Sequence, residues 1–462
     1  MAVWSEVSIN KLSQTSRLDP EYYQPVFIEN IDFLKNRCVH SVVNLGRLLN
    51  SISGGATPSG AEYPDEGVPF LRVQNIMPGY LNLNDVVYIP ESVHYGELQR
   101  SRLFSGDVLL TITGVSYGKA AYVPPTLGEA NINQHSVRMS LNSDILPEYL
   151  TTFLNCRFGK LQSDMKITGI TRPALDYGEI RTFLIPILPM PLQEEVRGIM
   201  HEAERTRQHS HDIYAEAENL LLHELGLDTL DLSHELTYER NFSEVAAAER
   251  FDAQYFHPEK QHVLEQLAKL PGQSIGTHYS VVDELLNPPS DDTGELVQNY
   301  DLTEALRFFL DDIEPMNAFN LGSTKKRFQR GDIVVSRLRS YLKEIAIVET
   351  SPTVSCVGSS EFIVLRPNET EISPELLIVY LRSPPVQKIL KWCQDGSNHP
   401  RFKEEELLSI KFPARILKVQ DEIKRIIRVA IQSHSDAKQL LEDAKRHVEQ
   451  MILGEEASYV SR

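Results

Sequence analysis

Short apolar runs, bounded by turn residues, recur in two parts of this 462-residue chain in the same order. The first part reads FSGDVLLTITGVSYGKAAYV at 104–123, and the second reads FQRGDIVVSRLRSYLKEIAIV at 328–348. Each has a Gly-Asp pair, an apolar run, Ser-Tyr-x-Lys and a second apolar run. Runs that are short and rich in β-branched residues predict buried strands. We therefore expect a duplicated unit with two such strands in each copy.

The segments around these strands repeat as well. ILPEYLTTFLN (145–155) corresponds to ISPELLIVYLR (372–382), and in both the proline suits the first turn of a helix. A glycine loop then precedes a Pro-flanked strand, TGITRPALDYGEIRTFLIP at 168–186 and DGSNHPRFKEEELLSIKFP at 395–413. Each copy also opens with a similar phrase, SRLDPEYYQP (16–25) and ERFDAQYFHP (249–258). Asp19 and Asp252 in these phrases suit the start of a short helix.

Each copy closes with a long stretch whose apolar residues step by three and four, as on one helix face. Both stretches end in a Leu-Gly pair, at 225–226 and 453–454, which is typical of a helix C-cap. The matching stripes favour packing of the two helices on each other, and the alternative is that each packs only on its own domain. The expected seam consists of Leu192, Val196, Ile199, Ala203, Ile213, Val419, Ile423, Ile426, Ala430 and Leu440.

The expected fold class is therefore α+β, with two pseudo-repeated, β-rich domains joined by two long antiparallel coiled-coil helices. The expected boundaries are 1–190 for the first domain, 191–226 for its helix, 227–415 for a connector with the second domain, and 416–462 for the second helix and tail.

Composition and charge narrow the function classes. Four widely spaced cysteines fit no zinc pattern and favour reduced thiols in a cytoplasm. No apolar stretch is long enough to span a bilayer, and the N-terminus lacks signal-peptide features. The net charge of −18 argues against nucleic-acid binding, but residues 191–250 alone hold 14 acidic and 5 basic residues. Residues 324–343 hold seven Lys or Arg against one Asp, so a local basic surface remains.

The ordered set of motifs, present twice, resembles the DNA-specificity (S) subunit of type I restriction–modification systems. The resemblance covers nearly the whole chain and includes GGATPSG, GVPFLRVQNIMPGYL and the helix opening PLQEEVRGI in the first copy. The second copy departs from it, with NPPSDDTGELVQNYDL near the place of the TPS stretch and no proline at the helix opening.

The resemblance implies a non-catalytic chain in which each half reads one half of a bipartite double-stranded DNA site. It further implies that the two helices dock two methyltransferase (M) subunits, that restriction (R) subunits join them, and that S-adenosylmethionine, ATP and Mg belong to those partners. A helix of about 35 residues is roughly 50 Å long, more than one turn of DNA, which suits a site with unread bases between its halves.

Candidate DNA contacts are polar and basic residues in three kinds of segment, since Arg reads guanine, Asn or Gln reads adenine, and Lys holds phosphate. The strand-and-turn segments give Arg100, Arg102, Ser116, Tyr117, Lys119, Lys325, Lys326, Arg327, Arg337, Arg339, Ser340, Tyr341 and Lys343. The glycine loops give Thr168, Thr171, Arg172, Ser397, Asn398, His399 and Arg401. The FLRVQN stretch gives Arg72, Gln74 and Asn75. We expect Arg337 and Arg339 to alternate along a strand and so to share a face.

Two motifs that suggest catalysis are weak. GVSYG (114–118) matches a nucleophile elbow, but a strand and not a helix is expected after it, and the second copy lacks both glycines. NPPS (287–290) lacks the aromatic residue with which an adenine methyltransferase stacks its flipped base. The alternatives that remain are the specificity chain of a type II system and a DNA-binding or coiled-coil scaffold of another defence complex.

Overall fold

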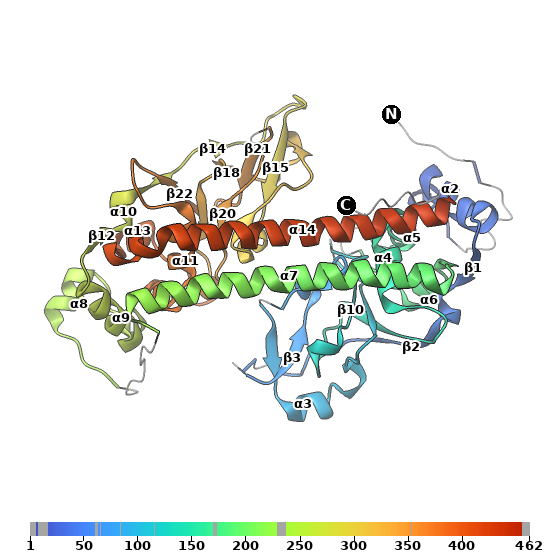
Figure 1. Cartoon of the computed structure of the whole chain (residues 1–462), viewed down its shortest axis with the longest axis horizontal. Coiled ribbons are helices and arrows are strands. Elements are labelled where there is room, and N and C mark those ends of the chain that lie inside the picture. Colours follow the sequence, from blue (N-terminus) through green and yellow to red (C-terminus); the bar gives the residue numbers. More distant parts are fainter. Residues whose placement is uncertain are drawn as a thin grey trace. The chain divides into compact units, whose positions relative to one another are not determined.

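The computed structural model describes residues 6–7, 17–60, 63–64, 66–83, 85–114, 116–169, 173–228, 237–351 and 353–454. Its described residues form two compact units, one within Met1–Arg207 and His434–Arg462 and the other within Gln208–Ser433. The boundary between the units crosses both long helices, so each unit contains one segment of each helix (Figure 1).

The first unit combines small sheets with short helices. Its sheets have the strand orders β2-β10-β7-β8, β6-β3-β9, β1-β11 and β4-β5. The strands are β1 (Ser41–Asn44), β2 (Leu49–Gly54), β3 (Val68–Leu71), β4 (Ile76–Met77), β5 (Tyr80–Leu81), β6 (Val87–Ile89), β7 (Val108–Thr111), β8 (Ala120–Tyr122), β9 (Asn131–Ile132), β10 (Ser136–Leu141) and β11 (Leu184–Ile187). The helices are α2 (Pro25–Asp32), α3 (Glu91–Tyr95), α4 (Pro147–Asn155), α5 (Arg157–Lys166) and α6 (Tyr177–Arg181), and the long α7 (Met190–Leu225) begins in this unit and continues into the second.

The second unit has larger sheets, with strand orders β13-β22-β19-β20-β16, β14-β18-β21-β15-β17 and β12-β23. The strands are β12 (Gly272–Ser274), β13 (Tyr279–Val282), β14 (Leu285–Leu286), β15 (Leu296–Tyr300), β16 (Phe309–Leu310), β17 (Met316–Asn317), β18 (Lys325–Phe328), β19 (Ile333–Ser336), β20 (Ile345–Val348), β21 (Ser355–Gly358), β22 (Phe362–Pro367) and β23 (Lys411–Pro413). The helices are α8 (Phe242–Ala248), α9 (Pro258–Ala268), α10 (Ile275–His278), α11 (Pro374–Arg382), α12 (Pro384–Cys393) and α13 (Glu404–Ser409), and the long α14 (Gln420–Leu453) begins in this unit and continues into the first.

The two units repeat one topology, which confirms the α+β, pseudo-repeated fold expected from the sequence. The order β2-β10-β7-β8 recurs as β13-β22-β19-β20, and β1-β11 recurs as β12-β23. The apolar runs are the hairpins β7–β8 and β19–β20, and the Pro-led segments are helices α4 and α11. The duplicated Gly-Asp pair makes the turn before the hairpin, where Gly106 and Gly331 have φ of 84° and 90°. Only glycine adopts such values without strain.

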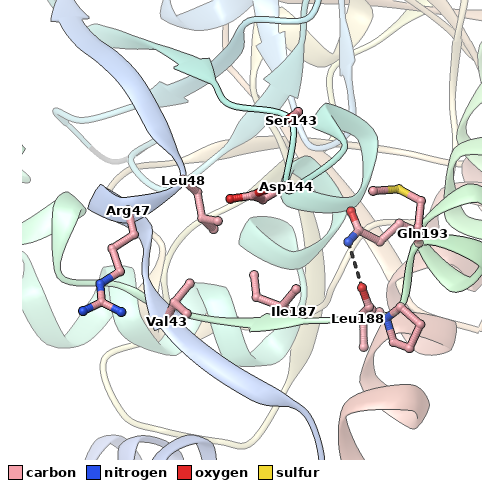
Figure 2. A pocket seen from close by; sticks show the side chains of 10 residues that line it. Val43, Arg47, Leu48, Ser143, Asp144, Ile187, Leu188 and Gln193 are labelled. Atoms are coloured by element: carbon pink, nitrogen blue, oxygen red, sulfur yellow. Dashed lines mark hydrogen bonds between the residues drawn. The ribbon is translucent and has the colours of Figure 1, made fainter.

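A glutamine has the same role at the start of each long helix, buried at Gln193 and half-buried at Gln420. Gln193 in α7 donates to the carbonyl of Leu188 and accepts from the backbone N–H of Leu146, at 2.9 and 2.8 Å (Figure 2). Gln420 in α14 accepts from the N–H of Ser373 at 2.9 Å. Because Leu146 and Ser373 are the N-cap residues of α4 and α11, each glutamine ties its long helix to the preceding domain.

The duplicated opening phrase anchors the chain to the helix that precedes the glycine loop. Asp19 and Asp252 are N-caps of short 3₁₀ helices at Pro20–Tyr23 and Ala253–Phe256, as expected. Each aspartate pairs with an arginine two residues earlier, at 2.6 Å in both copies. The Arg17 guanidinium donates to the carbonyl of Ile167, and the Arg250 guanidinium donates to those of Cys393 and Gln394. The opening segment is thus repeated because each copy binds the C-terminal end of the corresponding helix, α5 in the first unit and α12 in the second.

Helices α7 and α14 run antiparallel and contact each other in both units, as the apolar stripes predicted. In the first unit His447 lies 3.2 Å from Glu195. In the second, the Ser210 hydroxyl donates to the carbonyl of Ala430 at 2.6 Å. A side chain as small as serine can reach the facing backbone only where two helices approach closely. Both helices end before glycines with positive φ, 70° at 226 and 75° at 454, as expected for C-caps.

The seam residues lie at different depths. Val196, Ala203, Ile423, Ile426 and Ala430 are buried. Leu192, Ile199, Ile213 and Val419 are partly buried against the cores, and Leu440 is half-buried.

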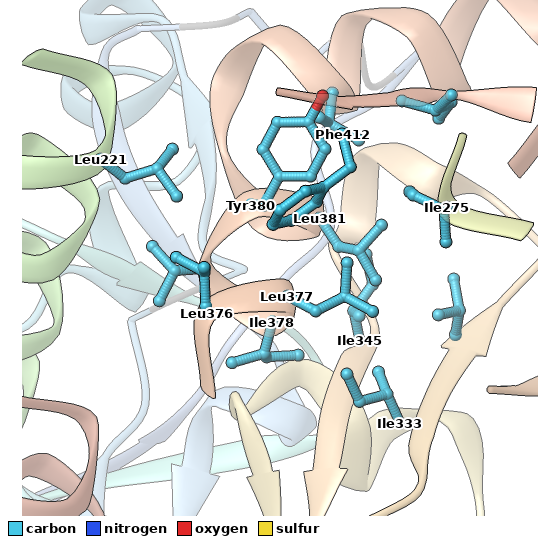
Figure 3. Packing of buried hydrophobic residues seen from close by; sticks show 14 of the residues in the cluster. Leu221, Ile275, Ile333, Ile345, Leu376, Leu377, Ile378, Tyr380, Leu381 and Phe412 are labelled. Carbon is cyan, nitrogen blue, oxygen red and sulfur yellow. The ribbon is translucent and has the colours of Figure 1, made fainter. Parts of the chain in front are cut away.

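The core of the second unit is built around helix α11. Leu376, Leu377, Ile378, Tyr380 and Leu381 are all at most 1% exposed, so nearly the whole circumference of this helix is buried. Figure 3 shows Leu221 of α7 facing Leu376 on one side, with sheet residues such as Ile333 and Ile345 on another. The long helix is therefore part of the domain core and is not merely a spacer.

We predict that Ile426→Asp lowers the melting temperature strongly. The side chain is 3% exposed in the helix seam, and burying an unpaired carboxylate costs about 3 kcal/mol or more. For a unit of this size we expect a fall of about 6 °C or more in scanning calorimetry. Val429→Asp is the matched control, because Val429 is 41% exposed on the same helix. Equal melting temperatures for the two variants would contradict the buried seam.

We also predict an acid-sensitive contribution from the two opening phrases. Hydrogen bonds from Arg17 and Arg250 lower the pKa of Asp19 and Asp252. A carboxyl group with a lowered pKa in the folded state stabilises the fold above its unfolded pKa of about 3.9, and this contribution is lost as the pH falls through the folded value. The Asp19→Asn/Asp252→Asn variant should therefore be less stable than the parent at pH 6, and this difference should narrow as the pH falls below about 3.9, as measured by urea unfolding. Asp291→Asn, in an exposed loop, should show no such pH-dependent difference.

Candidate nucleic-acid interface

The turn after β19 and the glycine loop after α12 are joined by backbone hydrogen bonds. The N–H of Arg339 donates to the carbonyl of Pro400 at 2.9 Å, and Leu338 forms an isolated bridge with Arg401. Asp395 and Arg401 exchange two backbone bonds, of 2.8 and 2.9 Å, which close the glycine loop. Two segments that sequence analysis selected separately therefore form one surface.

The first unit has the same set of bonds. The N–H of Gly114 donates to the carbonyl of Pro173 at 3.0 Å, and Thr113 is bridged to Ala174. Thr168 and Ala174 exchange two backbone bonds, of 2.9 and 2.8 Å. Residue numbers differ by 225 in the turn and by 227 in the loop. We call this pair of bonded segments the loop frame: the described residues of 112–119 and 168–175 in the first unit, and 337–344 with 395–402 in the second.

The backbone register shows that the Ser-Tyr-x-Lys match of the sequence analysis is wrong by one residue. In the first unit Thr111 donates from its N–H to the carbonyl of Lys119, and in the second Ser336 donates to that of Glu344. Lys119 therefore corresponds to Glu344, and Lys343 corresponds to Gly118. The motif recurs in the sequence without recurring in space, because the second turn holds its serine and tyrosine one position earlier.

Two left-handed positions in the frame are occupied differently in the two units. Gly114 and Gly118 have φ of 76° and 78°, and their counterparts Arg339 and Lys343 have φ of 51° and 54°. A side chain in this region costs on the order of 1 kcal/mol, which glycine avoids. The second unit thus tolerates strain where the first does not, and strain of this kind is common at functional sites.

The expectation that Arg337 and Arg339 alternate along a strand is wrong. Strand β19 ends at Ser336, so both arginines lie in the turn that follows. Arg337 Nε donates to Glu361 at 3.1 Å. The Arg339 guanidinium turns towards the glycine loop and donates to the carbonyl of Asn398 at 3.4 Å.

The other predicted residues of the second frame line the same surface. Tyr341, Ser397, Asn398, His399 and Arg401 are exposed. Ser340 is buried, and burial lowers the pKa of Lys343, whose backbone carbonyl accepts from Arg382 at 2.6 Å.

The predicted cluster at Lys325, Lys326 and Arg327 lies on strand β18 and is matched by carboxylates. Lys326 is buried and pairs with Asp283 at 3.0 Å. Arg327 donates to the Ser355 hydroxyl at 2.8 Å and pairs with Glu295 at 3.4 Å. Lys325 is half-buried. These contacts favour a role in holding the second sheet together.

The FLRVQN stretch is organised around Asp85. The side chains of Arg72, Gln74 and Asn75 all donate to this carboxylate, at 3.4, 2.7 and 2.8 Å. Asn75 is completely buried, so the structure places it in the interior and not on a DNA-facing surface. The polar groups that make this stretch a predicted contact motif bond to one another and to Asp85.

The remaining predicted residues of the first unit are mostly engaged within the chain. The Tyr117 hydroxyl donates to Asp164 at 2.9 Å, and burial together with this bond raises the pKa of Tyr117 to about 12. Arg102 pairs with Glu129 at 3.3 Å. Arg100 and Thr168 are exposed, and Ser116 and Lys119 are half-buried. Thr171 and Arg172 lie outside the described residues.

Two open cavities lie elsewhere. One, of about 690 Å³, is lined by Arg47, Asp144 and Gln193 among others at the start of α7 (Figure 2) and includes no predicted contact. The other, of about 450 Å³, is lined by Arg327, Arg330 and Arg366, but each of these arginines is paired with a carboxylate. The arginines of the second cavity are therefore matched by carboxylates.

Sequence reasoning missed Glu361, which lies at the centre of the second loop frame. Its carboxylate accepts from both Arg337 and Arg401. Glu361 precedes β22 in an ordinary polar turn, and no local pattern distinguishes it. Only the long-range pairing of β19 with β22 shows its position.

Within the described ranges, no cluster of three or more His, Cys, Asp or Glu side chains is arranged to hold a metal ion. In the same residues no helix combines the length and apolarity that a bilayer crossing requires.

No family model matches the chain, and no curated protein does. Among solved structures, the chain is similar to one from work on complex assembly and conformational transition of the type I R-M system, at 16% identity and TM-score 0.31 over 90% of this chain and 97% of that one. It is also similar to the HsdS subunit from Thermoanaerobacter tengcongensis, at 15% identity and TM-score 0.31 over 90% and 96%. A third is the type I restriction–modification system S subunit from M. genitalium, at 12% identity and TM-score 0.34 over 91% and 96%.

The strained turn yields a reciprocal prediction. Arg339→Gly should raise stability by about 1 kcal/mol, or about 2–4 °C in Tm, because it relieves a left-handed side chain. Gly114→Ala should lower stability by a similar amount, since a Cβ there meets no atom within 4 Å and backbone strain alone acts. Both are measured by thermal unfolding. A loss of stability in Arg339→Gly would show that the arginine is kept for its contacts within the fold.

Proposed function

We propose that the chain is the DNA-specificity subunit of a restriction–modification complex. In this proposal residues 1–190 and 227–415 are target-recognition domains, each of which reads one half of a bipartite DNA site. The helices at 191–226 and 416–462 dock methyltransferase subunits, and restriction subunits join this assembly. Catalysis and its cofactors belong to those partners in this proposal, which the resemblance in sequence motifs supports.

The observation that carries the proposal is the duplicated loop frame. The backbone bonds that join its two segments are the same in both units, whereas its side chains differ: Thr113 and Ala174 in the first correspond to Leu338 and Arg401 in the second. In a protein that serves only as a scaffold, nothing requires the polar side chains to differ between two copies of the same backbone arrangement. Two domains that recognise different half-sites require different polar side chains, because base edges are distinguished by the donors and acceptors that face them.

The second frame has the chemistry that base reading requires. Arg337, Arg339 and Arg401 lie within one small surface together with His399 and Asn398. Planar guanidinium groups favour bidentate contacts with acceptor pairs such as guanine O6 and N7. Half of the net charge of −18 comes from residues 191–250, with 14 acidic and 5 basic residues, so the negative total does not exclude a local cationic surface here.

The proposal predicts that a substitution in one unit changes the recognition of one half-site only. Arg337→Ala should cost about 1–3 kcal/mol in binding to the cognate site and relax base preference only in the second half-site. The measurement is binding or methylation by the complex purified from its host, on duplexes with single-base variants of both half-sites found by methylome sequencing. Arg330→Ala is the matched control, because Arg330 lies in the same unit and pairs with Glu349, outside the loop frame.

Three results would contradict the proposal in different ways. Lost discrimination in the first half-site alone would overturn the domain assignment. A uniform loss for all sequences, with a shallower salt dependence, would show that Arg337 holds phosphate. A purified complex without a methyltransferase and without sequence preference would favour the scaffold alternative.

A further inference from the structure

Glu361 connects the two segments of the second loop frame. Its backbone carbonyl accepts from the N–H of Arg337 at 3.1 Å, directly after strand β19 ends. Its carboxylate accepts from Arg337 Nε at 3.1 Å, and from Arg401 Nε and Nη2 at 2.9 and 2.7 Å. One acidic side chain therefore holds an arginine of the turn and an arginine of the glycine loop at the same time.

The two arginines are held in different ways. Arg401 uses all three guanidinium nitrogens within the chain, since its Nη1 donates to the carbonyl of His399 at 3.0 Å. Arg337 is held through Nε, and among the described residues no partner contacts its two terminal amino groups. Its side chain is 37% exposed. Arg401 thus fixes the position of Glu361, whereas the two terminal amino groups of Arg337 are available to bind a ligand.

The carboxylate is suited to this task. Hydrogen bonds from Arg401, and then from Arg337, lower the pKa of Glu361, so that it stays ionised at neutral pH. A guanidinium anchored at Nε has lost much of its rotational freedom and presents Nη1 and Nη2 in one plane. Guanine offers O6 and N7 as an acceptor pair at matching spacing in the major groove.

The first unit uses the corresponding position for different chemistry. The carbonyl of His135 accepts from the N–H of Ile112 at 2.9 Å, as that of Glu361 accepts from Arg337. The His135 ring is 2.8 Å from the Thr113 hydroxyl. In both units this position therefore fixes a polar group of the turn, through an imidazole in one and a carboxylate in the other.

We propose that Glu361 is the positioning residue that sets the base preference of the second half-site, by orienting the terminal fork of Arg337 while Arg401 braces it. This inference rests on the proposed function. Glu361 also places a negative charge beside the cationic surface, where it weakens binding to any phosphate backbone. Selectivity for the cognate base and rejection of unrelated DNA then come from the same side chain.

The test compares Glu361→Gln and Glu361→Ala with Glu349→Gln in the purified complex. Glu349 is a matched control because it too is shared by two arginines, Arg330 and Arg428, at 3.2 and 2.6 Å. The probes are duplexes with each single-base variant of both half-sites and one unrelated duplex of equal length, all at one salt concentration. Melting temperatures identify any variant that fails to fold, in which case the milder Glu361→Gln decides.

We expect both Glu361 variants to lose about tenfold discrimination in the second half-site, to keep the first unchanged, and to bind the unrelated duplex as well as or better than the parent. A fold defect alone would weaken binding to every duplex, and that result would overturn the inference. Unchanged discrimination in the second half-site would overturn it as well, with the proposed function intact if the parent still discriminates. A parent complex without base preference would overturn both.

Discussion

Each of the two largest hydrophobic core clusters is completed by a helix segment from the other repeat, and the rest of the fold depends on this exchange. Ala444, Val448, Met451 and Ile452 of α14 belong to the first core, and Leu221 of α7 belongs to the second. Neither repeat could bury its apolar surface with its own residues alone. The seam must therefore satisfy two demands at once, since each helix packs on its antiparallel partner and on the domain cores. This explains why its middle positions are small, and why a serine hydroxyl can reach the facing backbone.

In the loop frame, backbone hydrogen bonds hold the two segments together, and the side chains on their surface vary between the units. Its two segments are joined by backbone hydrogen bonds, which do not depend on side-chain identity. A turn position can therefore be glycine in one unit and arginine in the other while the frame is preserved, as at Gly114 and Arg339. The cost is local strain on the order of 1 kcal/mol, small beside the stability of a domain. A frame of this kind can change its surface chemistry without rebuilding its core.

The sequence predicted those features that restrict residue type locally. Helix ends at Leu-Gly, turns at Gly-Asp and the cap at Asp252 were predictable, because positive φ and unsatisfied N–H groups admit few residues. The site was less predictable. Nothing in the order of residues showed that Asn75 is buried against Asp85, or that Ser-Tyr-x-Lys lies out of register with its counterpart. These outcomes depend on partners far along the chain, and so does the place of Glu361.

The two repeats also preserve interactions whose residues have moved. In the first unit Lys166 of α5 donates to Glu179 at 2.8 Å. Cys393 takes the lysine's place in α12, and its thiol donates to Glu406, the counterpart of Glu179, at 3.3 Å. A lysine now comes from a different helix: Lys260 of α9 lies over the Tyr255 ring, whose hydroxyl donates to Glu406 at 2.9 Å. A cation is thus kept near the same acidic position although its source has changed. A residue-by-residue alignment of the two repeats therefore underestimates their similarity. Equivalent positions are better identified by the type of contact that is present than by the residue that makes it.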